Sequence, residues 1–227
     1  LLLWIFASLT PQEIREKLED NNGPFQKELI AYLESVHQGE YFTGQQDAVL
    51  ERIQEESKRE DTEYQNPTET LPIPPPAGKC KEQCSKCQNC IKYDTWHNQY
   101  LATTDDLILK SNIHKCGSSF NKDGSQNKTK QYVGCMDNKW GKCRARFPRQ
   151  LHKESHVDRV TGTLFMKKLE PWINTFTPAL TYLFRCNTDV TSLKSGTAIK
   201  AVTLYVSNYI TKTALKTHVV FDSIRSI

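Results

Sequence analysis

The chain has 227 residues, of which 37% are hydrophobic, and it carries a formal net charge of +4. This length allows one or two ordinary domains, but a mean hydropathy of -0.61 argues against a single compact core throughout. The opening run LLLWIFASL is too short to span a bilayer and lacks a basic n-region, which excludes a membrane helix there and argues against a signal peptide.

The charge is divided unevenly along the chain. Residues 1–79 carry 7 Lys or Arg against 15 Asp or Glu, a net charge of -8, whereas residues 110–168 carry 14 against 4, a net charge of +10. A local basic surplus of this size is expected for a phosphate-bearing partner such as a nucleic acid, although a solvated basic loop gives the same pattern.

The amino-terminal part predicts one strand and two helices. Residues 1–6 have the composition of the end of a buried strand that begins upstream of this chain. Thr10 opens a capping box, which predicts a helix over residues 11–20. Apolar residues at helical spacing predict a second helix over residues 25–37. We assign these elements to a first segment, residues 1–44.

The next segment, residues 45–79, is acidic and ends in a run of prolines. Its first part predicts a short charged helix around residues 45–60. Repeated prolines remove backbone donors and favour an extended chain, so the rest is expected to be a linker that acts as a spacer.

Two groups of cysteines follow, in a third segment that covers residues 80–168. The first group has the pattern C-x3-C-x2-C-x2-C, and such short intervals let four thiolates converge on one tetrahedral zinc ion. Four ligands within eleven residues require a crowded arrangement of the backbone, so some of them could instead share an ion with ligands elsewhere in the chain. The residues are Cys80, Cys84, Cys87 and Cys90.

The second group combines one histidine with three cysteines, which is a complete ligand set for a structural zinc ion. Gly117 and Gly134 stand beside the ligands and permit the turns that the site requires. Unligated buried cysteines or a disulfide are the alternatives, but clustering with a histidine suits metal ligation in a reducing compartment better. The residues are His114, Cys116, Cys135 and Cys143.

Residues 92–113, between the two groups, predict one helix. Its inner side is expected to carry Trp96, Tyr100, Thr103, Leu107 and Ile108. Asp105 and Asp106 are expected to face solvent, and His97, which lies off the apolar stripe, to be a surface residue.

A basic stretch over residues 139–149 interleaves cations with Trp140 and Phe147. Such a stretch can hold a sugar-phosphate backbone while its rings stack on unpaired bases, and a solvated cationic loop is the alternative. Its candidate nucleic-acid-binding residues are Lys139, Lys142, Arg144, Arg146 and Arg149.

The last segment covers residues 169–227. Residues 163–167, just before it, predict a short strand, and Thr177-Pro178 opens a helix with Leu180, Leu183 and Phe184 expected inward. Cys186, at the end of this helix, is expected to be a core thiol.

A final predicted helix, residues 197–212, places Tyr205 and Tyr209 one turn apart with Lys212 on the turn below. A phenol is a weak nucleophile at its usual pKa, so such a pair needs a cation or a metal ion to react. Two tyrosines in a buried helix, with their hydroxyls hydrogen-bonded, give the same pattern.

Four ordered motifs carry a family resemblance that covers nearly the whole chain. They are CRARFPR at residues 143–149, EPWINTFTP at 170–178, LFRCNTDV at 183–190 and YVSNYITK at 205–212. Together they resemble the replication-initiator part of fungal Helitron transposases, the rolling-circle DNA transposons, in the region known as the Helitron helicase-like domain. The resemblance implies an α+β fold: a truncated two-histidine-nuclease-like domain, mostly helical, with zinc-held loops and short strands.

The resemblance also implies a reaction. In this family a His-hydrophobic-His strand holds Mg²⁺ or Mn²⁺, which polarises a phosphate of single-stranded DNA, and a tyrosine attacks to form a 5′-phosphotyrosyl link. Tyr205 and Tyr209 match the two tyrosines, and Lys212 matches the lysine that follows them. Single-stranded DNA as partner and a nuclear location follow from the same resemblance.

The chain departs from the family pattern at both ends. It begins just beyond the expected His-hydrophobic-His strand, and the helicase expected downstream is absent. Without the cation the tyrosines lose the field that supports attack on a phosphate, so we expect this chain alone not to cleave DNA. Two hypotheses remain: a fragment of a strand-nicking initiator that needs its missing amino-terminal nuclease segment, or a non-catalytic, zinc-stabilised nucleic-acid-binding module.

Overall fold

The structure of the protein is a computed structural model. It describes residues 9–19, 23–59, 64–78, 80, 84, 87–120, 125, 133–158, 163–191, 203–204 and 206–207. The chain forms two compact units, one from Leu1–Gln26 with Ser192–Ile227 and the other from Lys27–Thr191. The larger unit takes in parts of all four predicted segments. The predicted strand at residues 1–6 lies outside the described residues.

Helix α1, Pro11–Glu19, belongs to the smaller unit and begins as predicted. The Thr10 N–H donates to Glu13 Oε2 at 2.7 Å, and the Glu13 N–H donates to Thr10 Oγ1 at 3.3 Å, so the capping box is formed. Leu18 is its buried residue. Helix α2, Pro24–Val36, confirms the second predicted helix and buries Leu33.

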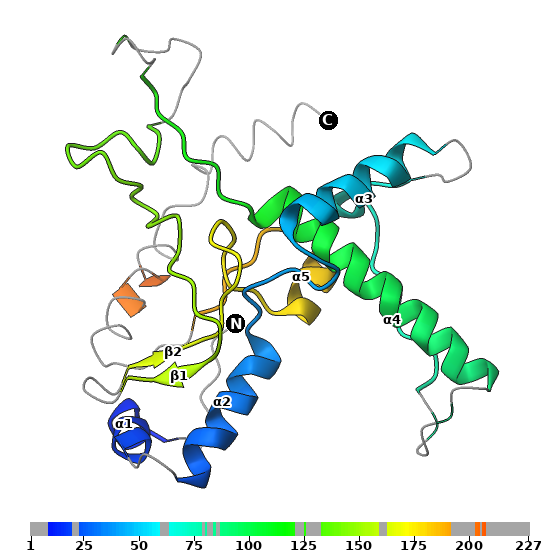
Figure 1. Cartoon of the computed structure of the whole chain (residues 1–227), viewed down its shortest axis with the longest axis horizontal. Helices are drawn as coiled ribbons and strands as arrows, with labels where there is room; N and C mark the ends of the chain where they lie inside the picture. Colours follow the sequence, from blue (N-terminus) through cyan, green and yellow to red (C-terminus); the bar gives the residue numbers. More distant parts are fainter. Residues whose placement is uncertain are drawn as a thin grey trace, which may run out of the picture. The chain divides into compact units, whose positions relative to one another are not determined.

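Two further helices organise the larger unit (Figure 1). Helix α3, Gln46–Lys58, carries Val49 and Ile53 into the core. Helix α4, Gln88–Leu107, begins at its N-cap Cys87 and continues into the π-helix η2, Ile108–Asn112. The helix predicted over residues 92–113 is thus confirmed, with a change of helix type in its last turn.

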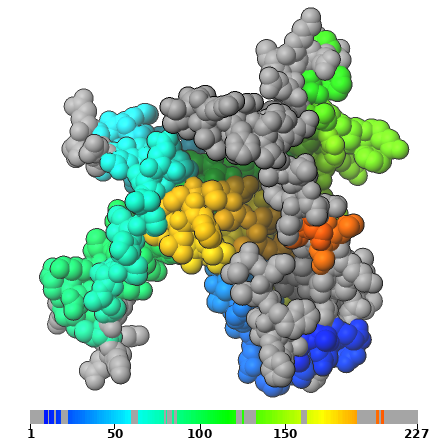
Figure 2. All heavy atoms as spheres, turned by 180° about the vertical axis from the view of Figure 1, so that it is seen from behind, coloured from blue at the N-terminus to red at the C-terminus, as the bar shows by residue number. Residues whose placement is uncertain are grey.

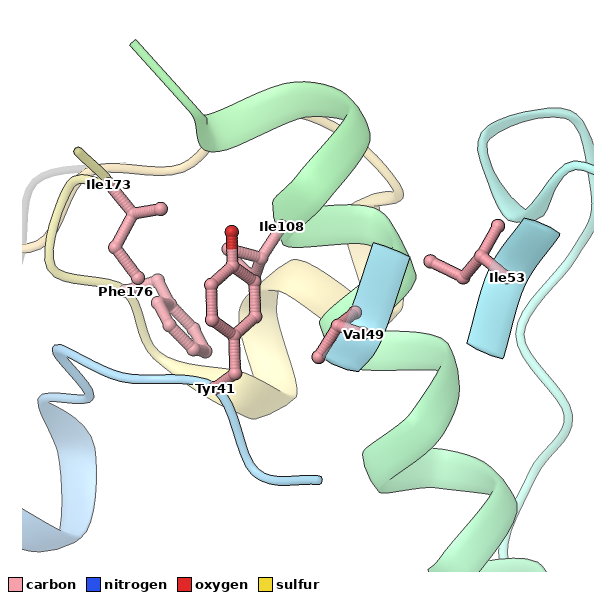
Figure 3. Close-up of a cluster of buried hydrophobic side chains, with 6 residues drawn as sticks. All are labelled: Tyr41, Val49, Ile53, Ile108, Ile173 and Phe176. Carbon is pink, nitrogen blue, oxygen red and sulfur yellow. The ribbon is translucent and has the colours of Figure 1, made fainter. Parts of the chain in front are cut away.

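The core of the larger unit forms where α3 and η2 meet two loops (Figure 3). Ile108 comes from η2, while Ile173 and Phe176 come from the loop before α5, Pro178–Phe184. Burial of these apolar side chains is the main favourable term that holds the segments together. The cluster consists of Tyr41, Val49, Ile53, Ile108, Ile173 and Phe176.

The strand content of the described residues is small. Strands β1, His156–Val157, and β2, Leu164–Phe165, pair antiparallel, with His156 opposite Phe165. The strand predicted at residues 163–167 is therefore confirmed as β2. A short 3-10 helix, η1 at Pro67–Glu69, precedes the proline run. The fold is α+β, with helices predominating over one two-stranded sheet.

The two aspartates at the end of α4 do not face solvent, which corrects the prediction. Asp105 is fully buried, and its carboxylate accepts hydrogen bonds from the backbone N–H groups of Phe42 and Thr43, both at 2.8 Å. Asp106 accepts from Tyr64 Oη at 2.6 Å and pairs with Lys110 at 2.8 Å. Burial raises the pKa of Asp105 despite these donors.

The buried face of α5 is also opposite to the one that was predicted to be buried. Leu180, Leu183 and Phe184 are exposed, whereas Thr181 and Tyr182 are buried. The reason is hydrogen bonding, because Thr181 Oγ1 bonds the Thr188 hydroxyl at 2.6 Å and Tyr182 Oη accepts from the Ile73 N–H at 3.1 Å. Cys186, expected to be a core thiol, is exposed.

The proline-rich segment is packed against helices and is not a free spacer. Trp96 Nε1 on α4 donates to Ile73 O at 2.9 Å, and Arg185 donates to Leu71 O at 3.3 Å. Figure 2 shows this segment, in teal, beside the yellow surface of residues 163–191. Among the described residues, none of the helices has the length and hydropathy needed to cross a bilayer.

Candidate metal centres and the basic loop

The first cysteine group converges as predicted. The Sγ atoms of all four cysteines lie within 4.8 Å of one another, and Cys80 Sγ is 3.6 Å from Cys87 Sγ. A tetrahedral zinc ion, about 2.3 Å from each sulfur, needs sulfur atoms about 3.8 Å apart. Cys87 is also the N-cap of α4, and its sulfur accepts from the Cys90 N–H at 3.5 Å. The group is therefore fixed to the start of a helix. Its members are Cys80, Cys84, Cys87 and Cys90.

The second group converges as well, although 18 residues separate two of its ligands. His114 Nε2 lies 3.5 Å from Cys135 Sγ and 3.2 Å from Cys143 Sγ, close to the spacing of about 3.6 Å that a tetrahedral zinc ion requires. Its four ligand atoms also lie within 4.8 Å of one another. The members are His114, Cys116, Cys135 and Cys143.

Close backbone packing brings the two ligand-bearing loops of this second group together. The Gly117 N–H donates to Cys135 Sγ at 3.4 Å, and the Met136 N–H donates to Gly117 O at 3.1 Å. A Cβ atom on Gly134 would lie only 2.1 Å from Gly117 O, so this position requires glycine. We predicted that the two glycines permit turns, but what the structure shows is that Gly134 permits the close approach of two loops.

Asp137 fastens the same two loops. Its carboxylate accepts from the Ser118 hydroxyl, from the N–H and hydroxyl of Ser119 at 2.8 and 2.5 Å, and from the Gly134 N–H at 2.6 Å. These donors, Ser118 first, hold the pKa of Asp137 well below its usual range. Our sequence interpretation missed this residue, although Ser118-Ser119 follow one ligand and Asp137 follows another at matching short intervals.

The imidazole of His114 is held by the basic stretch. Its ring stacks on Phe147, with ring centroids 4.2 Å apart and 11° between the planes. The guanidinium of Arg149 also lies over the Phe147 ring, 4.4 Å from its centroid. The backbone N–H of His114 donates to Trp172 O at 2.7 Å. Residues of the basic stretch therefore orient one metal ligand directly.

Each group contains one thiol that resists ionisation and one that ionises more readily than a free thiol. The hydrogen bond with Cys87 raises the pKa of Cys80 to about 12, while the Cys90 N–H lowers that of Cys87 to about 7. Burial raises the pKa of Cys116 to about 11. Burial also opposes ionisation of Cys143, but backbone N–H groups lower its pKa overall. One sulfur in each group is thus disposed to be a thiolate, the form that binds a metal.

The basic stretch extends from the second group as an exposed loop. Trp140 at its tip is 68% exposed, with Lys139 Nζ 5.0 Å from the ring centroid. Arg149, by contrast, is partly buried and donates to Asn174 Oδ1 at 3.3 Å, so it belongs to the supporting structure. The exposed cations are Lys139, Lys142, Arg144 and Arg146.

Other predicted site residues fall elsewhere. Tyr205, Tyr209 and Lys212 lie outside the described residues, so their proposed register stays a prediction. His97 is exposed, as expected, and stacks beside Tyr93 and Tyr100.

Comparisons of the chain with protein-family models, with curated proteins and with solved structures find no match. What the structure establishes on its own is that two Cys/His clusters could hold metal ions such as zinc.

Proposed function

We propose that the chain is a zinc-stabilised module that binds single-stranded DNA, as part of a Helitron-like rolling-circle replication initiator. The observation that carries the proposal is that the second metal group and the basic loop are in direct contact. His114, a metal ligand, packs on Phe147 of the loop, and Cys143 opens the segment that contains Arg144 and Arg146. In this proposal the module works in the nucleus with a helicase.

Zinc is the ion that suits both groups best. Four thiolates, or three thiolates and an imidazole, are closed ligand sets, and soft sulfur donors select zinc over magnesium or calcium. The donor atoms of each group lie within the spacing of a tetrahedral site. All four positions of each set are protein ligands, which corresponds to a structural ion.

Single-stranded DNA suits the loop better than a duplex does. The exposed ring of Trp140 can stack on an unpaired base, whose faces a duplex would cover. Lys142, Arg144 and Arg146 are exposed close by in the sequence and can neutralise phosphates. Binding of this kind tolerates many sequences and weakens with salt.

The binding proposal can be tested with a labelled 15-mer of thymidine in zinc-saturated protein. We expect Trp140→Ala to weaken binding by roughly 5- to 100-fold, because stacking of a base on an aromatic ring contributes about 1–3 kcal/mol. The double variant Lys142→Gln/Arg146→Gln, at two exposed cations, should reduce the salt dependence. Tyr32→Ala, at an exposed aromatic residue on α2, is the matched control. Equal affinities for the parent protein and both loop variants would refute the proposal.

The catalytic part of the proposal concerns Tyr205 and Tyr209. The 227 residues contain no His-x-His pair, so we expect the chain by itself not to nick DNA. Fusing a family-type His-x-His strand to the chain and adding Mn²⁺ should yield a covalent adduct with a labelled oligonucleotide. The adduct should disappear in Tyr205→Phe or Tyr209→Phe. A folded fusion protein that forms no adduct would leave only the binding module.

A further inference from the structure

A second candidate binding site lies between the proline-rich segment and α4. It is a groove of about 730 Å³, a size typical of small-ligand sites. None of the metal ligands lines it. Its walls come from α3, residues 64–73, α4 and the end of α5 (Figure 2 shows the teal and yellow sides). The polar residues that matter are Arg52, Tyr64, Asn98, Gln99, Asp106 and Arg185.

Arg185 is the distinctive charge of this groove. Its guanidinium is partly buried, lies 4.4 Å from the centroid of the Tyr182 ring, and donates to the backbone oxygens of Pro67 at 3.4 Å and Leu71 at 3.3 Å. Within the described part of the chain it forms no ion pair with a carboxylate. A partly desolvated cation without a counter-ion favours binding of an anion.

The other charges of the groove already have partners. Arg52 pairs with Glu56 at 3.5 Å and donates to Ala102 O at 3.2 Å. Asp106 is neutralised by Lys110 at 2.8 Å. Among the described residues that line the groove, Arg185 is therefore the charged residue without an oppositely charged partner, which favours an anion at that end.

The floor of the groove offers a different chemistry. Asn98 and Gln99 are exposed on α4, and neither amide has a hydrogen-bond partner among the residues that the structure describes. An amide supplies a donor and an acceptor together, which matches the edge of a nucleobase, adenine in particular. The groove is larger than a phosphate ion requires and can also take a planar base.

We propose that this groove binds one nucleotide, with its phosphate at Arg185 and its base edge at Asn98 and Gln99. A free mononucleotide and one residue of a single strand share this chemistry. The proposal is independent of the metal-held loop, because the two sites have no residue in common.

Calorimetric titration with deoxyadenosine monophosphate, inorganic phosphate and a 15-mer of deoxyadenosine tests the proposal. We expect the mononucleotide to bind more tightly than phosphate. Arg185→Gln should weaken binding of both by about tenfold or more, since it removes a charge-assisted hydrogen bond. Asn98→Ala/Gln99→Ala should weaken the mononucleotide several-fold and leave phosphate unchanged. Lys92→Gln, an exposed charge on the same helix, is the control.

Each outcome decides the question. Arg185 also donates to the backbone at residues 67 and 71, so Arg185→Gln could unfold the protein. The variant Asn98→Ala/Gln99→Ala changes exposed side chains only, so it tests the proposal in a folded protein. Mononucleotide binding that is no tighter than phosphate binding, or that is unchanged in the amide variant, overturns the proposal. If the 15-mer is weakened by the amide variant as well as by Trp140→Ala, the groove takes part in strand binding. If only Trp140→Ala weakens the 15-mer while the mononucleotide still responds, the groove is a separate site for free nucleotide. If Trp140→Ala does not weaken binding of the 15-mer but the mononucleotide still responds as expected, the loop proposal is refuted and the groove proposal stands.

Discussion

Removing the buried carboxylate of Asp105 should destabilise the larger unit more than any change at an exposed acidic residue of the same helix. Asp105 Oδ1 accepts from the Phe42 N–H, and Oδ2 accepts from the N–H and the hydroxyl of Thr43 at 2.8 and 2.6 Å. Hydrogen bonds to a charged group contribute about 1.5–3 kcal/mol each, but burial of the carboxylate offsets part of the sum. We therefore expect Asp105→Ala to cost about 2–4 kcal/mol.

The isosteric variant Asp105→Asn provides a graded control. Its single amide oxygen can keep the two bonds from Thr43, while its NH₂ group then meets the Phe42 N–H, donor against donor. We expect a loss of about 1–2 kcal/mol. For a unit of this size 1 kcal/mol lowers the melting temperature by about 2–4 °C, so thermal unfolding followed by circular dichroism separates the two variants. Asp94→Ala, an exposed acidic position on α4, should change little. If Asp105→Ala unfolds within about 0.5 kcal/mol of the parent, the buried carboxylate does not hold the turn at residues 42–43.

Three further predictions follow from the same structure. Cys135→Ser should remove about one equivalent of bound zinc and lower the melting temperature. Cys186→Ser, at an exposed cysteine outside both groups, should change neither. If Cys135→Ser binds as much zinc as the parent protein, the second site is refuted. Asp137→Ala should weaken zinc binding about 10- to 100-fold. Asp137→Asn should weaken it less, because its amide can still accept from Ser119 and donate to the Ser118 hydroxyl although it lacks the negative charge that these donors favour. Equal losses in the two variants would contradict this hydrogen-bond scheme. Burial, with Arg149 nearby, lowers the pKa of Lys168 to about 8, so its protonated form opposes folding. The free energy of unfolding, measured in saturating zinc, should therefore rise between pH 8 and 10.5 by up to about 3 kcal/mol relative to that of Lys168→Met. If the difference in this free energy between the two proteins does not change with pH, the lowered pKa is wrong.

The parts of the fold that the sequence predicted are those set by neighbours in the chain. The capping box at Thr10 and the apolar periodicity of α2 act within one or two turns, and both helices form where expected. The same holds for Cys80, Cys84, Cys87 and Cys90, whose convergence requires only short intervals.

The parts that it mispredicted depend on distant partners. Asp105 is buried because the turn at residues 42–43, 62 residues earlier, presents two N–H groups to it. Tyr182 turns inward because Ile73, 109 residues earlier, offers it a hydrogen bond, and this leaves Leu183 outside. Propensity and periodicity describe one element alone, so they cannot locate such partners.

Under the proposed function, the contacts between the second metal group and the basic loop give a reason for DNA binding to depend on the ion. Arg144 donates to Gly134 O at 2.9 Å, and Gly134 stands next to a ligand, Cys135. The loop therefore has two attachments to the site, this one and the stack of Phe147 on His114. A bound dication would fix all four ligands and so restrain both attachments, which reduces the conformational entropy that the exposed cations lose when a strand binds. Chelation should for this reason weaken DNA binding even though no nucleotide contacts the ion, and a chelated protein that binds the thymidine 15-mer with undiminished affinity would separate the two functions.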